Sequence, residues 1–443
     1  MGSVGREKVS DTRVFIRLAV VLFLCRTAIG AALIPPWQGP DEPPHYVVAE
    51  QVARGAVGDA SQRAELEREV LRSMALHDWW RSYRLATPDP LPTNFAQEPN
   101  HLGTGGMVQP VYYLLAGSVL RITGVTGLDS RYFVLRLVSV LLGVATIVMA
   151  FAGTRLLFDE STACVVALAA ALHPQFLLTA LSVTPDALAN AFGALLWWQG
   201  ARFIVSGRAA ATVIAAGAAV AAALTKRNAV PLLGAVVVLV STGLWRNVRW
   251  SGRSAAAAII AGCGLIAAAG FVFWTSSSEP VVQLRAQWYS TLFQVNATSD
   301  FTLRRAVNFT LGLIDSSWLV AGWLRFPAPD WWLRAVRALT IITVAGAGAA
   351  FIRRSSLRCP LGVSSALAAS LVVAAIANGL MTGSAPQGRY LFVVAAPLAV
   401  LLWVGFAEWW PERWRWLAAP ALIALLLFLD VSGWITTMLP AYV

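Results

Sequence analysis

The sequence predicts an all-α protein that crosses a membrane many times. Of its 443 residues, 57% are hydrophobic and only 13% are charged, which is about half the charged share of a soluble domain. The mean hydropathy is +0.64. The apolar residues fall into runs of roughly 16 to 24, the length that crosses a bilayer as a helix. These values exclude a soluble enzyme, a disordered chain and a disulfide scaffold.

About eleven runs have the length and composition of membrane spans. We expect the first run to be an uncleaved span rather than a signal peptide, because it is long and contains Arg17 and Arg26. The predicted spans are residues 14–34, 131–153, 161–180, 187–204, 209–224, 229–245, 255–275, 331–352, 361–382, 389–407 and 417–439.

The arginines predict the orientation of these spans. With the N-terminus in the cytoplasm, eleven spans place most of the loop arginines on the cytoplasmic side, as the positive-inside rule requires, and the C-terminus outside. The net charge of +11 therefore reflects topology, and we expect no nucleic-acid partner. The cytoplasmic arginines in this threading are Arg155, Arg202, Arg208, Arg246, Arg249, Arg253, Arg353, Arg354, Arg358, Arg413 and Arg415.

Two further apolar stretches, residues 108–122 and 306–324, are predicted to be helices that lie on the outer surface or dip into it. If the first stretch spanned, whether alone or with the second, the arginine loops from Arg155 to Arg253 would face outward. The whole chain then forms one integral-membrane domain (residues 1–443) with two large external segments, 35–130 and 276–330. The first of these is expected to carry short surface helices, at residues 61–73 and 77–85.

The first external segment opens with a stiff, acidic stretch. Five prolines fall within the ten residues 35–44, and they restrict the backbone on both sides of each ring. Asp41, Glu42 and His45 lie in or beside this stretch, at the membrane surface. A rigid, acidic site of this kind suits a general base or a metal ligand. The alternative is a helix start that Asp41 or Glu42 caps.

A second carboxylate, Asp186, is expected on the same side of the membrane. It ends the short external loop 181–186, in which Thr184 or Asp186 could instead cap the next helix. His173 lies earlier in the preceding span. An ionisable group at membrane depth usually faces a cavity or a partner, and simple packing of the ring is the alternative.

Three cations break the positive-inside pattern: Lys226, Arg227 and Arg389 are all predicted to face outward. An anionic ligand such as a phosphate would account for them, and the planar guanidinium of arginine suits such a ligand. The alternative is pairing with the nearby carboxylates or with lipid headgroups.

Aromatic residues gather near the same surface. Tyr112 and Tyr113 follow Pro110 at the start of the surface stretch 108–122. Tryptophans of the second external segment form either an aromatic belt at the interface or a platform for a sugar ring or a prenyl chain. These tryptophans are Trp318, Trp323, Trp331 and Trp332.

In their order, these motifs resemble the GT-C superfamily of polyprenyl-phosphate-dependent glycosyltransferases, which includes protein O-mannosyltransferases, lipid A aminoarabinose transferases and oligosaccharyltransferases. They are most similar to a bacterial GT-C-like family of predicted membrane proteins. The usual His-Pro-Pro of the superfamily reads Val108-Gln109-Pro110 here. The residues that carry the resemblance are Asp41-Glu42, Gln109-Pro110-Val111-Tyr112-Tyr113, Arg136, His173-Pro174, Asp186, Ala321-Gly322-Trp323 and Gln387-Gly388-Arg389-Tyr390.

The resemblance implies an inverting glycosyltransferase at the outer face of a bacterial plasma membrane. Its donor would be a polyprenyl-phosphate-linked sugar, and its acceptor a cell-envelope glycan, a lipid or a protein. Asp41 would be the general base, with Glu42 or His45 orienting it and Asp186 as the second carboxylate. The donor phosphate would bind Lys226, Arg227 and Arg389. The other expected substrate contacts are Tyr46, Tyr112, Tyr113, His173, Trp323, Gln387 and Tyr390.

The sequence leaves open whether a divalent cation binds and whether the protein is a transporter or flippase, or a glycan polymerase or ligase. A divalent cation, Mg or Mn, between Asp41 and Asp186 is compatible with the motifs but not required by them. The same charges would also suit a transporter or flippase of an anionic lipid-linked glycan, or a glycan polymerase or ligase. Transporters often contain inverted repeats and broken helices near the midplane, and the sequence has no visible repeat.

Overall fold

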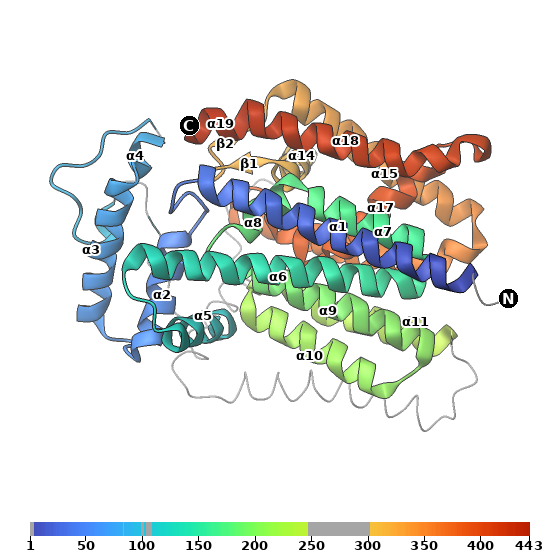
Figure 1. Ribbon diagram of the computed structural model, residues 1–443, viewed down its shortest axis with the longest axis horizontal. Coiled ribbons are helices and arrows are strands. Elements are labelled where there is room, and N and C mark those ends of the chain that lie inside the picture. Colours follow the sequence, from blue (N-terminus) through green and yellow to red (C-terminus); the bar gives the residue numbers. More distant parts are fainter. Residues whose placement is uncertain (1–3, 83, 99–101, 103–108, 247–301) are drawn as a thin grey trace.

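The computed structural model describes residues 4–82, 84–98, 102, 109–246 and 302–443. Long helices run side by side in a bundle, and α2 to α5 gather at one end of it (Figure 1). We call α2 to α5 the end layer. It consists of α2 (Glu42–Arg54), α3 (Ala60–Leu76), α4 (Trp79–Ser82), the 3₁₀ turn η1 (Phe95–Gln97) and α5 (Pro110–Thr123).

The bundle itself is made of the remaining helices and one short hairpin. Its first half consists of α1 (Val4–Leu33), α6 (Leu128–Leu157), α7 (Glu160–Leu172), α8 (Pro174–Ala180), α9 (Pro185–Ser206), α10 (Ala209–Thr225), η2 (Arg227–Ala229) and α11 (Pro231–Arg246). Its second half consists of α14 (Leu303–Trp318), β1 (Val320–Ala321), β2 (Phe326–Pro327), α15 (Asp330–Arg353), η3 (Ser355–Leu357), α16 (Arg358–Thr382), η4 (Gly388–Val394), α17 (Ala395–Glu408), η5 (Glu412–Leu417), α18 (Ala418–Gly433), the π-helical η6 (Trp434–Met438) and α19 (Leu439–Tyr442).

The described residues confirm an all-α polytopic membrane protein. Seven of their helical segments are long and apolar enough to cross a bilayer, or eight if a bent pair counts as one span. The expected total of eleven stays a prediction, because the run 255–275 lies outside the described residues. The seven segments are Arg13–Leu33, Leu128–Leu157, Arg227–Leu244, Asp330–Arg353, Ser355–Thr382, Gly388–Glu408 and Glu412–Tyr442.

The predicted span 161–180 is not one straight helix. It divides into α7 and α8, which meet at His173 with a bend of 66°. Pro174 causes the break, because a proline ring removes a backbone N–H and clashes with the preceding turn. The runs 187–204 and 209–224 form α9 and α10, and α10, with 17 residues, is one of the shorter apolar helices.

The two apolar stretches that were predicted at the outer surface form short helices. The stretch 108–122 is α5, which packs against α2 in the end layer. The stretch 306–324 is helical only as far as Trp318, so the expected helix is wrong over its last residues. Gly322, Trp323 and Leu324 have φ values of 51°, 52° and 66°, which a right-handed helix does not contain. These residues turn the hairpin in which Val320 pairs with Pro327.

The surface helices expected in the first segment are found in part. The helix at 61–73 is present as α3, and Asp59 caps it by accepting from the backbone nitrogens of Ser61 and Gln62. The helix at 77–85 is wrong except for the single turn α4. Asp78 and Arg84 have φ values of 51° and 57°, which end the helix on both sides.

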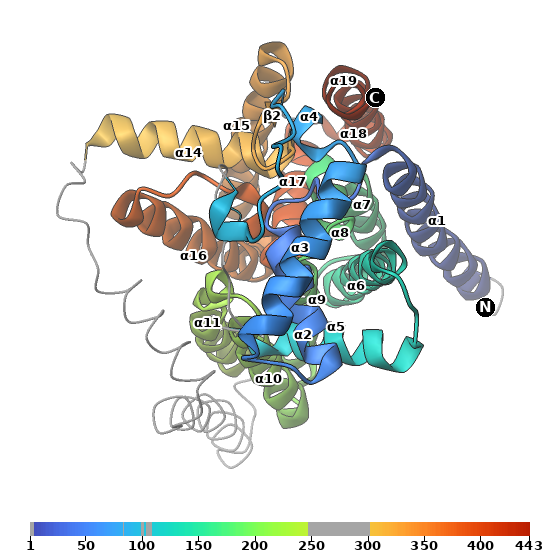
Figure 2. The same cartoon turned by 90° about the vertical axis from the view of Figure 1, so that its left-hand side faces the viewer.

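Aromatic packing joins the end layer to the bundle. Trp37 is fully buried, and its ring lies 4.4 Å from that of Tyr132 in α6. The carbonyl oxygen of Trp37 accepts hydrogen bonds from Trp79 Nε1 at 3.0 Å and from Trp323 Nε1 at 3.2 Å. The hairpin loop and the end layer are therefore fastened at one point. Figure 2 shows the end layer in front of the bundle, with α14 projecting to one side beside α16.

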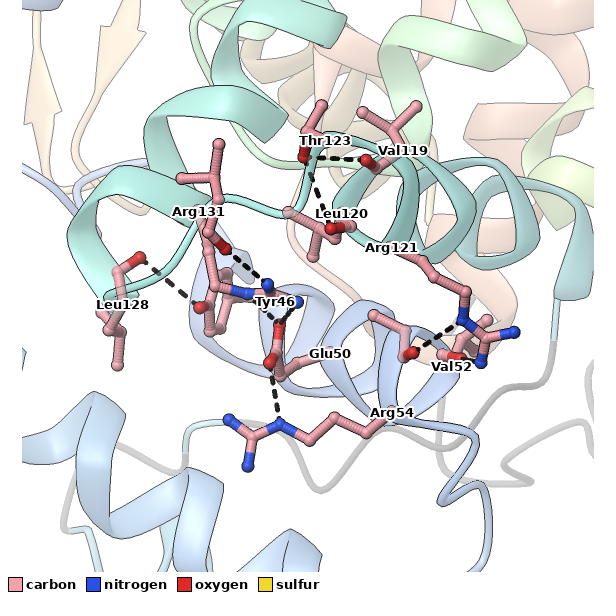
Figure 3. Close-up of polar contacts among 12 residues, drawn as sticks. Tyr46, Glu50, Val52, Arg54, Val119, Leu120, Arg121, Thr123, Leu128 and Arg131 are labelled. Atoms are coloured by element: carbon pink, nitrogen blue, oxygen red, sulfur yellow. Dashed lines mark hydrogen bonds and ion pairs between the residues drawn. The ribbon is translucent and has the colours of Figure 1, made fainter.

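An ion cluster joins α2 to α6, and hydrogen bonds from Arg121 join α5 to α2 (Figure 3). Glu50 of α2 accepts from Arg54 Nε at 2.8 Å and from Arg131 of α6 at 2.8 Å. We call these three residues the Glu50 cluster. Arg121 of α5 donates to the carbonyl oxygens of Ala53 and Val52 at the C-terminal end of α2, where a helix presents unpaired acceptors.

Candidate functional site

Four charged side chains from four distant parts of the chain meet between the end layer and the bundle. Arg389 Nη2 lies 2.8 Å from Asp41 Oδ2, and its Nε lies 3.5 Å from Asp186 Oδ2. Lys226 Nζ lies 2.8 Å from Asp186 Oδ1. We call these four residues the charge quartet. The sequence predicted all four as site residues, and the structure brings them together.

Asp41 occupies the N-cap position of α2 without capping it. Its backbone is left-handed, with φ 65° and ψ 11°, and its side chain accepts no hydrogen bond from the helix. Aspartate tolerates this conformation better than most residues. Pro43 and Pro44 fit the first turn, where no N–H partner is needed. The carboxylate is therefore turned from the helix toward Arg389, and its side chain keeps 43% of its surface exposed.

Asp186 lies in the first turn of α9, and Thr184 provides the cap. Thr184 Oγ1 accepts from the Asp186 nitrogen at 3.3 Å and donates to Asp186 Oδ2 at 3.1 Å. Because threonine satisfies the helix start, the aspartate side chain is available for Lys226 and Arg389. It is only 3% exposed, and the N-terminal end of a helix favours a negative charge.

Arg389 is held by several contacts at the start of η4. Its Nε donates to Gln387 Oε1 at 3.0 Å, and its Nη1 donates to the Pro40 carbonyl oxygen at 3.3 Å. Gly388 lets the segment approach α14 closely, since a Cβ there would lie 2.1 Å from the Ser317 nitrogen. The Tyr390 ring faces both cations, at 5.3 Å from Arg389 Cζ and 5.1 Å from Lys226 Nζ, within the range of cation–π attraction.

The two cations and two carboxylates of the quartet balance in charge. The pairing that the sequence left as an alternative is thus realised for Lys226 and Arg389. Burial by itself would raise the pKa of Asp41, but the nearby Arg389, His45 and Lys226 together hold the pKa of this carboxyl below its ordinary value. Asp41 is therefore ionised at neutral pH, and a ligand anion must compete with it for Arg389.

His45 lies one turn after Asp41 in α2 and belongs to the same site. Its Nδ1 is 2.8 Å from the hydroxyl of Tyr113 in α5, and Tyr112 packs edge-on to the ring at 6.5 Å. Burial and the charge of Lys226 lower the pKa of His45 to about 4, although Asp41 and Asp186 oppose this shift. The ring is therefore neutral at neutral pH. Burial also raises the pKa of Tyr113, so its hydroxyl stays protonated.

Glu42 acts as a structural link beside the quartet. Its Oε1 accepts from Tyr132 Oη at 2.9 Å and from the Val183 nitrogen at 2.8 Å, and its Oε2 accepts from the Gly39 nitrogen at 2.7 Å. A Cβ at Gly39 would lie 2.4 Å from Ser182 Oγ, so glycine permits this close contact. Glu42 thus joins the loop that carries Asp41 to the loop that precedes Asp186.

Three predicted substrate contacts have other partners in the structure. Tyr46 donates to the Leu128 carbonyl oxygen at 3.4 Å, at the start of α6. His173 stacks on Trp318 at 4.7 Å, inside the bend between α7 and α8. Trp323 donates to the Trp37 carbonyl oxygen. These contacts tie elements together and do not include the quartet.

The tryptophans of residues 318–332 differ in their surroundings: some pack inside the protein and one is exposed. Trp318 Nε1 donates to Thr340 Oγ1, and Trp332 Nε1 donates to the Leu429 carbonyl oxygen, each at 3.0 Å. Trp331 is 44% exposed, as expected for a residue of an interfacial belt.

An apolar cavity of about 270 Å³ lies beside the quartet, between α11, α14, α16 and η4. Its polar lining residues are Arg227, Asn228, Asn378, Ser384, Gln387 and Tyr390, of which Arg227, Gln387 and Tyr390 were predicted as site residues. Gln387 and Tyr390 contact Arg389, so they connect the cavity to the quartet. Its apolar wall consists of Val230, Pro231, Phe309, Leu313, Leu371, Ala374, Ala375, Ala377, Met381, Ala385 and Leu391.

Two further features were missed by sequence reasoning. A small cavity of about 30 Å³ touches Asp186 and Arg389, and the polar side chains of Gln38, Gln175 and Tyr442 are part of its lining. Its size suits one or two water molecules or a single hydroxyl group. Gln109, quoted in the sequence only as part of a motif, contacts the segment that carries Lys226. No local sequence pattern predicts either feature, because each depends on residues that are far apart in the chain.

The arrangement does not fit a divalent cation between Asp41 and Asp186. The Arg389 guanidinium bridges the two carboxylates, and Lys226 holds the other oxygen of Asp186. Two positive charges thus already stand where the metal would bind. Within the described part of the chain, no group of three or more His, Cys, Asp or Glu side chains is placed to hold a metal ion.

Solved structures similar to the chain are those of oligosaccharyltransferases, which are GT-C superfamily enzymes. One is archaeal AglB from Archaeoglobus fulgidus in complex with an inhibitory peptide and a dolichol-phosphate, with 13% identity, a TM-score of 0.49 and coverage of 98% of this chain and 56% of that chain. Another is an Archaeoglobus fulgidus oligosaccharyltransferase tethered with an acceptor peptide, with 13% identity, a TM-score of 0.46 and coverage of 97% and 54%.

The chain therefore spans about half the length of these enzymes. No curated protein matches its sequence. The model of the family described as "Predicted membrane protein (DUF2142)" matches residues 24–402, and the chain belongs to this family.

Proposed function

We propose that this protein is an inverting membrane glycosyltransferase, which transfers a sugar from a polyprenyl-phosphate donor to a hydroxyl acceptor at the external face of a bacterial plasma membrane. One observation carries the proposal: Gln387 and Tyr390, which contact Arg389 of the charge quartet, also line an apolar cavity. Cations beside carboxylates suit a phosphate and a proton acceptor, and an apolar cavity at the same place suits a lipid chain.

The donor would bind across the boundary between the cavity and the quartet. Its phosphate would contact Arg389 and Lys226, which are both buried and already oriented. Its prenyl chain would lie on the apolar wall, of which Phe309 and Leu371 are part. Tyr390 and Gln387 stand between the two halves of such a ligand. A donor that carries its own phosphate needs no nucleotide-binding domain.

Donor binding would also activate the base. In the structure Arg389 is the cation that most lowers the pKa of Asp41. A phosphate that takes over the guanidinium weakens this ion pair, and the pKa of Asp41 then rises toward its ordinary value. A carboxylate with a higher pKa is a stronger proton acceptor. The site would therefore be most reactive once the donor is bound.

The chemical step uses groups of the quartet. The Asp41 carboxylate takes the proton of the acceptor hydroxyl, and the oxygen attacks the anomeric carbon of the donor sugar. The bond between that carbon and the phosphate oxygen breaks, and its electron pair leaves with the phosphate. Arg389 and Lys226 stabilise the charge that develops there. Attack opposite to the leaving group inverts the anomeric centre.

The proposal includes no metal-dependent step. Because Arg389 and Lys226 supply the positive charge at the leaving group, we expect a chelator such as EDTA to leave turnover unchanged. A large loss with EDTA that Mg or Mn restores would contradict this part of the proposal.

The test is sugar transfer or release from a panel of synthetic polyprenyl-phosphate sugars by the purified protein in nanodiscs. We expect turnover by the wild type and a loss of at least about a hundredfold in Asp41→Asn. A matched control is Asp129→Asn, which changes a carboxylate that binds Ser73 in the end layer and should keep turnover within about twofold.

Two outcomes would overturn the proposal. Full turnover by Asp41→Asn at normal expression would show that Asp41 is not the base. Donor binding by the wild type without turnover on any donor and acceptor, together with donor movement between leaflets, would favour the transporter or flippase. The helix break at His173 does not support transport, because Trp318 and Phe392 fill it.

A further inference from the structure

Lys226 lies in a gap between two helical elements. The helix α10 ends at Thr225, and η2 begins at Arg227. Lys226 itself has an extended backbone, with φ −150° and ψ 125°. Its own helix therefore does not fix the direction of its side chain. Other contacts must hold the segment for Lys226 Nζ to stay 2.8 Å from Asp186.

Gln109 supplies such contacts from both sides of the lysine. With the amide oriented by its hydrogen-bond partners, Gln109 Nε2 donates to the Thr225 carbonyl oxygen at 3.2 Å. Its Oε1 accepts from the Arg227 nitrogen at 3.0 Å. The amide thus spans Lys226 and pairs with the backbone of both neighbours. This geometry uses the donor and the acceptor of one side chain together, which only an amide of this length provides.

The position of Gln109 in its own helix is unusual for glutamine. It is the N-cap residue of α5, yet its side chain makes no cap hydrogen bond there. N-cap positions favour shorter side chains such as Ser, Thr, Asp and Asn, which reach back to their own helix. Pro110 follows and restricts the Gln109 backbone to an extended conformation, observed at φ −128° and ψ 90°. The amide is thereby directed away from α5.

The same helical turn also holds the other side of the site. Tyr113, one turn after Gln109, bonds His45 of α2 at 2.8 Å, and Asp41 begins that helix. The first turn of α5 therefore contacts both the segment that carries Lys226 and the helix that carries the proposed base. A shift of this turn would move Lys226 relative to Asp41.

We infer that Gln109 is a positioning residue: its amide clamps the backbone around Lys226 and so sets the place of the ammonium group in the charge quartet. This inference rests on the proposed function for its catalytic consequence, because Lys226 is there a ligand of the donor phosphate. The clamp itself concerns only the position of Lys226, so it can be tested without measuring sugar transfer.

The first experiment measures how fast an amine-acylating reagent modifies Lys226 in the full-length protein in detergent. Lys226 and Lys8 are the two lysines of the chain, so Lys8 is the internal reference in each mass spectrum. Lys226 is 9% exposed and paired with Asp186, and we expect it to react slowly in the wild type. In Gln109→Met, which has similar length but no amide, we expect acylation about tenfold faster, the size of losing two ordinary hydrogen bonds.

Three variants serve as controls. Gln109→Glu keeps an acceptor for Arg227 and loses the donor for Thr225, so its effect should fall between wild type and Gln109→Met. Asp186→Asn removes the ion pair and should expose Lys226 directly. Gln97→Met, whose Oε1 accepts from the Thr93 nitrogen at 3.1 Å in the end layer, should leave the acylation rate unchanged.

Equal acylation of Lys226 in wild type and Gln109→Met, with faster acylation in Asp186→Asn, would overturn the inference. A faster rate in Gln109→Glu at an unchanged unfolding temperature supports it even if Gln109→Met folds poorly. If the wild type transfers no sugar, the proposed function fails, and the acylation result still decides whether the clamp exists.

The second experiment is a double-variant comparison of sugar transfer. Gln109→Met should lower kcat/KM for the donor about tenfold, because a displaced Lys226 both binds the phosphate and stabilises the leaving group less well. Gln109→Met combined with Lys226→Ala should be no worse than Lys226→Ala alone, since both act through one ammonium group. Additive losses would show that Gln109 acts elsewhere and would overturn its positioning role.

Discussion

Two groups of paired charges in this protein use the same chemistry to different ends. The Glu50 cluster (Figure 3) and the charge quartet each centre on one buried carboxylate that two cations hold. The Glu50 side chain is 2% exposed and the Asp186 side chain 3%. Burial and pairing alone therefore do not distinguish the two.

The two groups differ in what surrounds the pair. In the Glu50 cluster, Arg131 directs a further donor to the Val125 carbonyl oxygen at 2.7 Å, and Arg54 lies one helical turn from Glu50. In the quartet, Arg389 also pairs with a second carboxylate, Asp41, whose backbone is left-handed, and its neighbours Gln387 and Tyr390 line the apolar cavity. Glu69 lies 3.9 Å from Arg54 in the Glu50 cluster, so a second carboxylate alone does not distinguish the groups. The left-handed backbone of Asp41 and the neighbouring apolar cavity are what make the quartet a candidate site.

The largest expected difference between the two groups is for arginine-to-lysine changes. Arg389→Lys keeps the charge but cannot reach Asp41, Asp186 and Gln387 together, so we expect transfer to fall about a thousandfold, as for loss of a major charge-stabilising group. Arg131→Lys in the Glu50 cluster should keep transfer within about threefold. Similar losses in both variants would show that the two groups do not differ in function.

Stability should respond in the opposite way. Glu50→Gln leaves Arg131 partly buried without its carboxylate, and we expect the free energy of unfolding to fall by about 3 kcal/mol. Glu65→Gln, an exposed residue of α3, is the matched control and should change stability little. Chemical unfolding in detergent measures both. Transfer per folded molecule should be unchanged in Glu50→Gln, and a loss beyond about tenfold would assign the Glu50 cluster to the active site.

Much of the charge quartet could be predicted from the sequence, because its members stand out locally. Asp41 follows a proline-rich exit from a span, and Lys226 and Arg389 are predicted on the side where basic residues are rare. Their convergence could not be derived from spacing, since it depends on how α2, α9, α10 and η4 pack. The apolar wall of the cavity gave no signal, because Phe309 and Leu371 look like any residues of apolar helices.

The fold was predictable where hydropathy alone decides. The long spans such as α6 and α15 follow from composition, whereas the break at His173 and the hairpin after Trp318 do not. A proline inside an apolar run can either kink a helix or end it, and the tertiary packing of Trp318 against His173 decides here. The hairpin needs left-handed residues at 322–324. Two of these residues are not glycine, so the sequence contains no turn motif that predicts the hairpin.

The pH dependence of stability sharpens the comparison, because His45 lies beside the charge quartet. The unfolded chain binds a proton at His45 near pH 6.5, whereas the folded chain binds one only near pH 4. The unfolded state thus binds more protons between these values, and stability falls as the pH drops through this window. The lowered pKa of Asp41 adds nothing above pH 5, since its contribution is lost only below the pKa of an unfolded aspartate.

We expect the wild type to lose about 2 kcal/mol from this source between pH 7 and pH 5. Unfolding in detergent at the two pH values measures the loss, and His45→Gln should remove it. An unchanged slope in His45→Gln would contradict a neutral His45 beside the charge quartet.

The smallest expected effect concerns a tyrosine that lies beside each group. Tyr390 faces Arg389 and Lys226 with its ring, so Tyr390→Phe should change the donor KM less than about threefold, because the ring and not the hydroxyl attracts the cations. Tyr390→Leu should raise it about fivefold to tenfold, the size of two cation–π contacts. Beside the Glu50 cluster, Tyr46 donates a 3.4 Å hydrogen bond to the Leu128 carbonyl oxygen, and neither Tyr46→Phe nor Tyr46→Leu should change the donor KM. If Tyr390→Phe were as impaired as Tyr390→Leu, the hydroxyl would be the group that contacts the donor, and the boundary between cavity and quartet would be a polar contact rather than an aromatic face.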